Sequence, residues 1–384
     1  MRNSLNVNIH DTSVGELVKE DDKYIFSYTQ DNADFISLTM PYRKEQYINT
    51  KLHPIFEMHL PEGYLLSIIK KHFSKITKTD DFGLLKLMAQ SIHGRITYDS
   101  KHNNKTNALQ LEDLLNPSSD KLFEELVSKF ALNSVLSGVQ PKVLVTIEDR
   151  VTLKYDDYIV KSWGDEYPQL ALNEYLCMNI VKYAGIEVPE FYISNDEKLF
   201  IMKRFDILDN RTILGFEDMC VLQAKQREDK YEGTYEQVVK TIKTFVSPRH
   251  KKASLKQFFK MIAINNFIQN GDAHLKNFGL LYSDLKDIKL APTYDVVSTT
   301  TYIKNDIPAL NLLGSKKWWD KKYILRFGVE SCELTKSQVE ELYEECVVAA
   351  KKVLDEIEER LVSEADDSKI NILNHLYSLL KILS

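Results

Sequence analysis

The segment NGDAHLKNFGLLY (270–282) places an Asp, a His, a Lys and an Asn within six residues, directly after a stretch with the apolar pattern of a helix. Asp272 and Asn277 stand five positions apart. In the catalytic loop of protein kinases, HRDxxxxN, the Asp accepts the proton of the substrate hydroxyl and the Asn binds magnesium. The spacing therefore predicts a phosphoryl-transfer loop, in which His274 and Lys276 add hydrogen-bond donors for the transferring phosphoryl group.

A second metal ligand follows this segment. Mg²⁺ prefers oxygen ligands and needs carboxylate and phosphate oxygens beyond one Asn. Asp295, in APTYDVVST, follows a strand-like hairpin (LLYSDLKDIKLAPTYD) and lies 18 residues after Asn277, where a kinase carries its second metal-binding Asp. An isolated Asp usually caps a turn, but the order of Asp272, Asn277 and Asp295 favours a metal site. We predict Asn277 and Asp295 as ligands of Mg²⁺.

A lysine inside an apolar strand is the expected nucleotide contact. Lys161 lies in YIVKSW (158–163), where a lone charge has to be paired or directed at a ligand. Glu174, on the next expected helix, is its expected partner, as in the lysine–glutamate pair of kinases. A lysine that extends from a strand edge into water is the alternative. Before this strand, SGVQPK (137–142) places a glycine and a turn whose backbone N–H groups are suited to a phosphate.

The chain changes from strand-rich to helix-rich along its length. The polar stretch YDSKHNNKTN (98–107) is the expected linker after a small α+β module. The predicted domains are 1–105, 106–225 and 226–384. Expected strands are 5–9, 23–28, 35–40, 142–147, 158–163, 188–194 and 198–205, and expected helices begin at Pro61 and span 169–183, 235–245, 254–269, 336–362 and 370–383. The pattern predicts an α+β protein with a ligand cleft between a strand-rich and a helical lobe.

Composition excludes several other classes. The chain has 384 residues, 43% hydrophobic and 28% charged, which is ordinary for a globular protein of more than one domain, and no run of about 18 apolar residues. The N-terminus lacks a secretory pattern, so we expect a cytoplasmic protein without membrane contact. The four scattered cysteines are interpreted as small buried hydrophobic residues, and the nine histidines show no paired metal spacing.

Two charged features and one motif have simpler interpretations. The net charge of -6 argues against extensive direct binding of nucleic acid, although SPRHKK (247–252) and SKKWWDKK (315–322) are basic. We interpret SPRHKK as a solvated loop. Asp81-Phe82-Gly83 resembles the kinase DFG but precedes the expected catalytic loop, so we interpret it as the capped start of a helix with Phe82 and Leu84 in a core.

Several motifs together resemble the HipA family of toxin serine/threonine kinases. They are SGVQPK, the strand lysine, NEYLCMNIVKYAGIEVP, MKRFD, FEDMC, GDAHLKNFGLL and APTYDVVST, with VGELV, LTMPYR, HPIFEMHLPEG and DFGLL in the N-terminal part. The resemblance covers nearly the whole chain. It implies a two-lobed protein-kinase-like fold with a small N-terminal α+β domain and a helical C-terminal lobe. It also implies a bacterial kinase that acts as the toxin of a type II toxin–antitoxin module.

The resemblance further implies partners and site residues. The partner is a helix-turn-helix antitoxin of the HipB type, through which the chain meets DNA only indirectly, and the substrate is a translation component, with aminoacyl-tRNA synthetases the known class. Asp272 matches the catalytic base, and Glu217 to Met219 match the hinge that holds adenine by its backbone. The residues expected at ATP are Ser137, Gly138, Val139, Gln140, Lys142, Lys161, Glu174, Glu217, Asp218, Met219, His274, Lys276, Asn277, Tyr294 and Asp295.

One position departs from the family pattern. Three residues before the loop glycine, where the best-known members carry a regulatory serine that the kinase itself phosphorylates, this chain has Val135. Ser134 and Ser137 flank that position and are the candidate autophosphorylation sites. A phosphate on Ser137 would clash with the ATP phosphates or displace the loop.

Two other functions stay open. A kinase acting on a small molecule, such as an aminoglycoside or a choline-like alcohol, shares the Asp-x4-Asn spacing. A catalytically silent module would instead bind a DNA-binding antitoxin and support repression. The presence of Lys161, Asp272, Asn277 and Asp295 together argues against the silent module.

Overall fold

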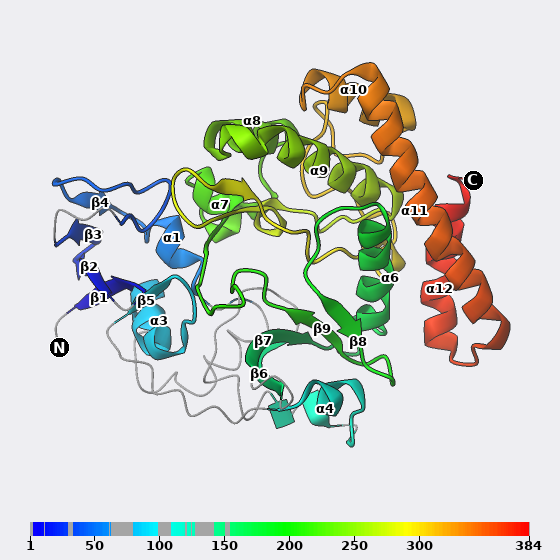
Figure 1. Cartoon of the computed structure of the whole chain (residues 1–384), viewed down its shortest axis with the longest axis horizontal. Helices are drawn as coiled ribbons and strands as arrows, with labels where there is room; N and C mark the ends of the chain where they lie inside the picture. The colour runs from blue at the N-terminus through cyan, green and yellow to red at the C-terminus, as the bar shows by residue number, and fades with distance from the viewer. Residues whose placement is uncertain are drawn as a thin grey trace. The chain divides into compact units, whose positions relative to one another are not determined.

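The computed structural model describes residues 3–10, 12–29, 34–60, 62, 80–98, 109–119, 121–123, 125–126, 142–149 and 154–383. The chain forms two compact units, residues 1–162 with 201–228 and residues 163–200 with 229–384. The first unit is rich in strands and the second in helices, which confirms the predicted α+β class (Figure 1). The three-part division at residues 105 and 225 stays a prediction.

An antiparallel five-stranded sheet begins the first unit. Its strands are β1 (Ser4–Ile9), β2 (Thr12–Glu20), β3 (Lys23–Tyr28), β4 (Tyr47–Asn49) and β5 (Ile96–Tyr98), in the order β4-β3-β2-β1-β5. Successive side chains of a strand point to opposite faces, so β1 buries Leu5, Val7 and Ile9 and leaves the residues between them half-buried. This sheet therefore has one face on a core.

Short helices accompany this sheet. They are α1 (Pro54–Glu57), α3 (Asp81–Met88), the 3-10 turn η1 (Ala89–Ser91) and α4 (Leu111–Leu115). The motif Asp81-Phe82-Gly83 forms the start of α3, and Phe82 and Leu84 are buried as predicted. The capping residue is the preceding Asp80, whose carboxylate accepts the Gly83 N–H at 2.8 Å.

Two expectations for this unit are wrong. Residues 35–40 do not form a strand but a tight turn, with a bridge between Ser37 and Met40. Tyr98, the first residue of the expected linker, is the last residue of β5 and is fully buried, with its hydroxyl 2.9 Å from His59 Nδ1. The rest of that linker (99–107) lies outside the described residues, as does the helix expected from Pro61, apart from Glu62.

A second sheet contains the predicted strand pair. β6 (Lys142–Asp149) and β7 (Lys154–Lys161) form an antiparallel hairpin, and β9 (Phe200–Lys203) lies next to β7. β7 ends at Lys161, two residues before the expected end. The first unit continues through β10 (Gly215–Asp218) and α7 (Met219–Leu222) and ends at Glu228, within the 3-10 helix η2 (Arg227–Tyr231), so that Tyr231 belongs to the second unit.

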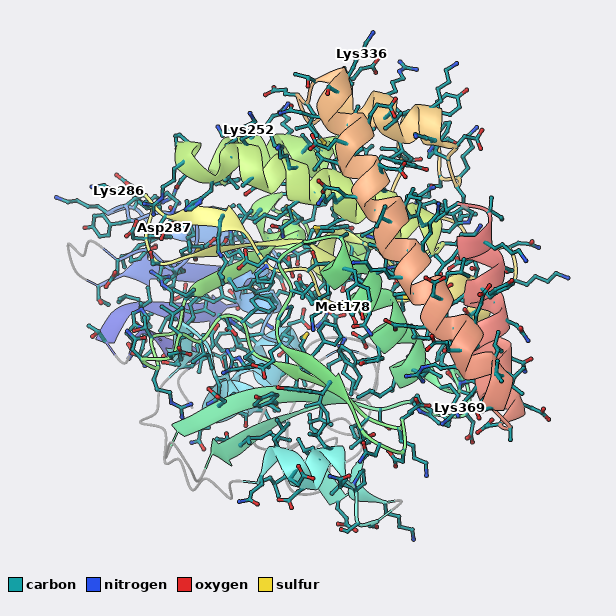
Figure 2. The ribbon with its side chains drawn as sticks, turned by 45° about the vertical axis from the view of Figure 1, so that its right-hand side comes forward. Met178, Lys252, Lys286, Asp287, Lys336 and Lys369 are labelled. Atoms are coloured by element: carbon teal, nitrogen blue, oxygen red, sulfur yellow. The ribbon has the colours of Figure 1, made fainter. Side chains whose placement is uncertain are left out.

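The second unit is built mainly from helices around the buried α6 and α9. Its elements are α6 (Leu170–Tyr183), β8 (Phe191–Ile193), α8 (Tyr235–Phe245), α9 (Pro248–Phe267), η3 (Leu275–Asn277), β11 (Gly279–Tyr282), β12 (Ile288–Leu290), η4 (Thr299–Thr301), α10 (Lys321–Glu330), α11 (Lys336–Ser363) and α12 (Asp367–Lys381). Figure 2 shows α11 starting at Lys336, with α12 alongside it at Lys369. α11 also packs against α6, α9 and α10.

The predicted helices of this unit are confirmed, with two differences. α8 has the predicted bounds, because Thr234 and Gln237 form a capping box before an apolar face of Val238, Val239 and Ile242. SPRHKK is not a loop: Ser247 precedes α9 and Pro248 is its first residue, where a missing N–H is tolerated. α10 (Lys321–Glu330) was not foreseen.

The cysteines behave as predicted. All four are free and buried within their units: Cys177, Cys220, Cys332 and Cys346. Within the described ranges, no helix is both long enough and apolar enough to cross a bilayer.

Arg227 ties η2 to two acids of the N-terminal helices. Its backbone N–H donates to Glu57 Oε2 at 2.8 Å, and its guanidinium lies 3.8 Å from Glu57 Oε1 and 2.8 Å from Asp81 Oδ1. Glu57 is only 3% exposed, and burial raises the pKa of its carboxyl from 4.5 to about 7, although Arg227 opposes the shift. A carboxyl with a raised pKa binds its proton more tightly in the folded state, so stability falls as the pH rises through this window.

We therefore expect stability to decrease by up to ~3 kcal/mol between about pH 4.5 and about pH 7 on account of Glu57. Thermal unfolding across this pH range checks the prediction. Glu57→Gln should flatten the pH dependence of Tm, because a neutral amide does not titrate. Glu16→Gln, an exposed position on β2, is the matched control and should keep the wild-type profile. An unchanged profile in Glu57→Gln would contradict the assignment.

Candidate active site

The predicted catalytic loop begins where α9 ends. The helix stops at Phe267, two residues before the expected end, and Gln269 adopts the left-handed conformation with φ of 52°. The Asn270 N–H donates back to the Asn265 carbonyl at 2.9 Å, which satisfies one of the last carbonyls of the helix. This reversal directs the chain out of the core and into the loop.

Gly271 is the point at which this loop is anchored. Its N–H donates to Thr299 Oγ1 at 2.7 Å, and the Thr299 hydroxyl donates to Asp306 Oδ2 at 2.5 Å. A Cβ atom on residue 271 would lie 2.0 Å from Asp306 Oδ2 and 2.8 Å from Thr299 Oγ1. A side chain at residue 271 therefore requires the Asp306 carboxylate to move away from Thr299.

Asp272 presents its carboxylate on the surface of the second unit. Its N–H donates to Asn270 Oδ1 at 3.0 Å, which fixes the backbone, and its side chain is 45% exposed. The Tyr231 hydroxyl donates to Asp272 Oδ1 at 2.6 Å. The carboxylate therefore already accepts a hydrogen bond from a hydroxyl group, which is the contact that a general base needs.

His274 contributes a neutral imidazole. It is 6% exposed, its Nε2 lies 3.8 Å from Asp272 Oδ1, and its buried Nδ1 has no hydrogen-bond partner among the described residues. Burial lowers the pKa of His274 below its ordinary value, although the Asp272 carboxylate opposes the shift. His274 therefore offers an N–H donor near the loop but no positive charge at neutral pH.

The two predicted metal ligands lie next to each other. Asn277, buried at the end of η3, has its Nδ2 at 3.4 Å from the backbone carbonyl of Asp295. Asp295 adopts the left-handed conformation with φ of 60°, which Asp tolerates better than most residues. Tyr294 joins the same two segments, because its hydroxyl donates to the Lys276 carbonyl at 2.8 Å.

An asparagine of α6 holds the segment that follows Asp295. Asn173 Nδ2 donates to the Ser298 carbonyl and Asn173 Oδ1 accepts the Ser298 N–H, each at 2.9 Å. Both residues are completely buried, so each bond replaces one that water would otherwise supply. Sequence reasoning missed this residue. Its signal in the sequence is an uncharged polar residue, next to Glu174, in a helix whose other buried residues are mostly apolar.

These residues suit a magnesium ion. Asn277 and Asp295 offer amide and carboxylate oxygens, which hard cations prefer, and Mg²⁺ typically takes one or two carboxylates together with phosphate oxygens. Among the described residues, no group of three or more His, Cys, Asp or Glu could form an all-protein metal cage. These donors therefore suit an ion whose coordination is completed by oxygens of a bound ligand.

In the first unit, the two predicted lysines lie opposite each other. Lys142 of β6 pairs in register with Lys161 of β7, so both side chains lie on the same face of the hairpin. Lys161 is 2% exposed. Ser134, Val135 and Ser137 to Gln140 lie outside the described residues. Glu174, the expected partner of Lys161, is fully buried in α6 of the second unit.

The predicted adenine hinge is also in the first unit. Glu217 and Asp218 end β10, and Met219 begins α7, which Asp218 caps by accepting the Val221 N–H at 3.0 Å. The fully buried Glu217 carboxylate accepts the Ser37 hydroxyl and the Leu38 N–H, both at 2.8 Å. The turn at Ser37 and Leu38 therefore holds the side chain of this predicted hinge residue, a contact that sequence reasoning missed.

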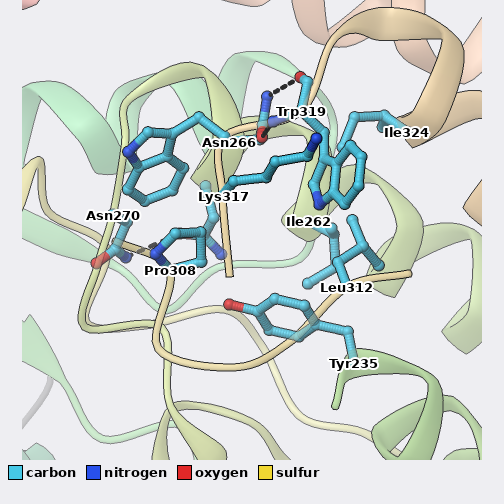
Figure 3. A pocket seen from close by; sticks show the side chains of 11 residues that line it. Tyr235, Ile262, Asn266, Asn270, Pro308, Leu312, Lys317, Trp319 and Ile324 are labelled. Atoms are coloured by element: carbon cyan, nitrogen blue, oxygen red, sulfur yellow. Dashed lines mark hydrogen bonds between the residues drawn. The ribbon is translucent and has the colours of Figure 1, made fainter. Parts of the chain in front are cut away.

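A small pocket adjoins the loop on the second unit (Figure 3). It is lined by Tyr235, Ile262, Asn265, Asn266, Asn270, Pro308, Leu312, Lys317, Trp318, Trp319 and Ile324. Tyr235 donates to the Ala273 carbonyl at 3.1 Å, and Trp318 Nε1 donates to the Asp306 carbonyl at 3.1 Å. Tyr235 thus supports the loop, and Trp318 of SKKWWDKK supports its anchor at Asp306.

Family models match both parts of the chain. The model of the HipA N-terminal domain matches residues 5–99, and that of the HipA-like C-terminal domain matches residues 134–354, more than half of the chain. The chain therefore belongs to the HipA family. This confirms the resemblance drawn from its motifs.

Relatives and a solved structure agree with this membership. The putative kinase Y4dM of Sinorhizobium fredii is 25% identical over 293 residues, covering 70% of this chain and 68% of its own. A putative kinase of Haemophilus influenzae is 31% identical over 186 residues, covering 44% of this chain and 53% of its own. A chain from the Shewanella oneidensis complex of HipA, HipB and operator DNA superposes with a TM-score of 0.72 and 19% identity, over 99% of this chain and 96% of its own. This last likeness confirms the predicted kinase-like HipA fold.

Gly271→Ala should disrupt the anchor of the loop. The added Cβ displaces the Asp306 carboxylate from Thr299. This should lower the free energy of unfolding by ~1–3 kcal/mol, as overpacking of a well-packed site does. We expect a lower Tm and at least a tenfold loss of any activity that depends on Asp272. Gly164→Ala is the control, because a Cβ there meets open space. Wild-type activity in Gly271→Ala would show that the anchor is dispensable.

Asn173→Ala should release the segment after Asp295. The substitution leaves the buried N–H and carbonyl of Ser298 without their partner, which should lower the free energy of unfolding by ~1–3 kcal/mol. We also expect any rise in Tm that Mg²⁺ and ATP cause in the wild-type chain to diminish, because the segment after Asp295 is no longer held in place. Asn179→Ala, the other buried asparagine of α6, is the control and should keep that rise. If Mg²⁺ and ATP raise the Tm of Asn173→Ala as much as that of the wild-type chain, Asn173 does not position this segment.

Proposed function

We propose that this chain is an ATP-dependent protein serine/threonine kinase and the toxin of a type II toxin–antitoxin pair. The observation that carries the proposal is the geometry of the loop: an exposed Asp272 carboxylate, and a buried Asn277 whose amide meets the backbone of Asp295. Family membership, and relatives that are named putative kinases, support it.

Each residue has a role in this proposal. Asp272 orients a protein hydroxyl and accepts its proton as the oxygen attacks the γ-phosphorus of ATP. Asn277 and Asp295 hold Mg²⁺, which neutralises charge on the phosphates when bound. Lys161 and Lys142, which pair in register on one face of the β6–β7 hairpin, contact the phosphates. Positioning and charge compensation supply most of the rate.

The proposed partners follow from the family. The substrate is a translation component, an aminoacyl-tRNA synthetase in the first instance, and the antitoxin is a helix-turn-helix protein of the HipB type. The similar Shewanella oneidensis chain was solved with HipB and operator DNA, which supports this partner. The net charge of -6 supports contact with DNA through the antitoxin rather than directly. Ser134 and Ser137 are the proposed serine sites of self-modification.

Asp272→Asn tests this function. The amide has the same shape but cannot accept the proton, so we expect at least a hundredfold loss of phosphoryl transfer, at the lower end of what a general base contributes. Folding should be unaffected, because the side chain is half-exposed. Phosphopeptide mapping of host proteins after expression of each chain provides the measurement. Asp209→Asn, an exposed position of the first unit, is the control. Normal phosphorylation in Asp272→Asn would remove the central assignment.

A further inference from the structure

A tyrosine of the chain occupies the place at which a kinase receives its substrate hydroxyl. The Tyr231 hydroxyl, at the end of η2, donates to Asp272 Oδ1 at 2.6 Å. A general base must lie within about 2.6–3.2 Å of the oxygen whose proton it takes, and this contact meets that requirement. The base is thus already paired with a hydroxyl from its own unit.

Three contacts hold Tyr231 in this position. The Lys316 ammonium donates to the Tyr231 carbonyl at 3.1 Å, which fixes the backbone. The ring meets the His274 ring edge-on, with centroids 5.0 Å apart and planes at 80°. The ammonium of Lys230 lies 5.3 Å from the ring centre. The side chain is nevertheless 42% exposed, so the hydroxyl is ordered without being enclosed.

We propose that Tyr231 is a phosphoacceptor of this chain, modified within the same molecule. The inference rests on the proposed kinase function. Asp272 takes the phenolic proton, the phenolic oxygen forms a bond to the γ-phosphorus of ATP, the bond from that phosphorus to the β–γ bridging oxygen breaks, and ADP leaves. The products are a phosphotyrosine at residue 231, ADP and a proton that Asp272 passes to solvent.

Phosphorylation of Tyr231 would remove the hydrogen bond between Tyr231 and the Asp272 carboxylate. A phosphotyrosine carries a charge of about -1.5 to -2 and has no hydroxyl proton to donate, so it is repelled by the Asp272 carboxylate. Lys230, next in the chain, supplies a cation for the displaced phosphate. Phosphorylation of Tyr231 would therefore expose Asp272 to other hydroxyl groups.

Neighbouring hydroxyls provide an internal comparison. Cleavage after lysine releases the peptide YEGTYEQVVK (231–240), which also contains Thr234 and Tyr235. Tyr235 is 4% exposed and donates to the Ala273 carbonyl, and Thr234 caps α8 by accepting the Gln237 N–H. The geometry therefore assigns the phosphate to the first residue of this peptide and to neither of the others.

The experiment incubates the purified full-length chain with Mg²⁺ and ATP and locates phosphate by fragmentation of this peptide. Phosphate should be present on Tyr231, at a first-order rate independent of protein concentration, and absent in Asp272→Asn. Tyr231→Phe should lose the phosphate on this peptide. Tyr183→Phe is the matched control, because Tyr183 is 39% exposed and donates to Glu356 Oε1 at 2.7 Å far from the loop in sequence. It should keep the wild-type rate on Tyr231.

The outcomes separate this inference from the function on which it rests. Phosphate on a serine or on an added protein, with none on Tyr231, would overturn the inference and leave the kinase function intact. Phosphate on Tyr231 whose rate rises with protein concentration would overturn modification within one molecule. Absence of ATP-dependent phosphate on any protein would overturn both.

Discussion

One hydrogen-bonded junction positions the candidate active site. The Thr299 side chain accepts the N–H of Gly271 and donates to Asp306, so a single hydroxyl links the start of the proposed catalytic loop to the segment after Asp295. A backbone N–H in a partly buried turn needs such a partner, since an unpaired one costs free energy. One residue earlier, Ser298 is held to α6 by Asn173. The loop with the proposed base and the segment with the proposed metal ligand Asp295 are therefore fixed to the same helical core.

Burial differs between neighbouring polar groups of the site. The Asp272 side chain is half-exposed, whereas His274 beside it is enclosed, and burial lowers the pKa of its imidazole so that it is neutral at pH 7. Glu217 shows how a buried carboxylate is tolerated, because two donors from the turn at Ser37 and Leu38 compensate it. Those donors explain why residues 35–40 are not a strand: the Leu38 N–H is used by a distant carboxylate rather than by a neighbouring strand.

Elements with a strong local signal were predictable. α8 and α11 were found within a residue or two because each has a capping box and an apolar face of helical period. α10 was missed because Gly328 weakens its helical pattern, although packing requires that glycine: a Cβ there would lie 2.5 Å from Val339 and 2.7 Å from Phe259. α9 begins six residues before the expected Ser254. The start was predicted too late because the charged residues of its first turns have no apolar helical pattern.

The sequence by itself determined the family, the α+β class, the main helices, and the order and spacing of Asp272, Asn277 and Asp295. These follow from local periodicity, capping and short motifs, which involve residues close together in the chain. Only the tertiary structure decided that Tyr231 meets Asp272 across 41 residues, that Asn173 meets Ser298 across 125, and that Ser37 meets Glu217 across 180. Such contacts depend on how complete elements pack, and no local pattern encodes which distant hydroxyl or amide will face a given carboxylate.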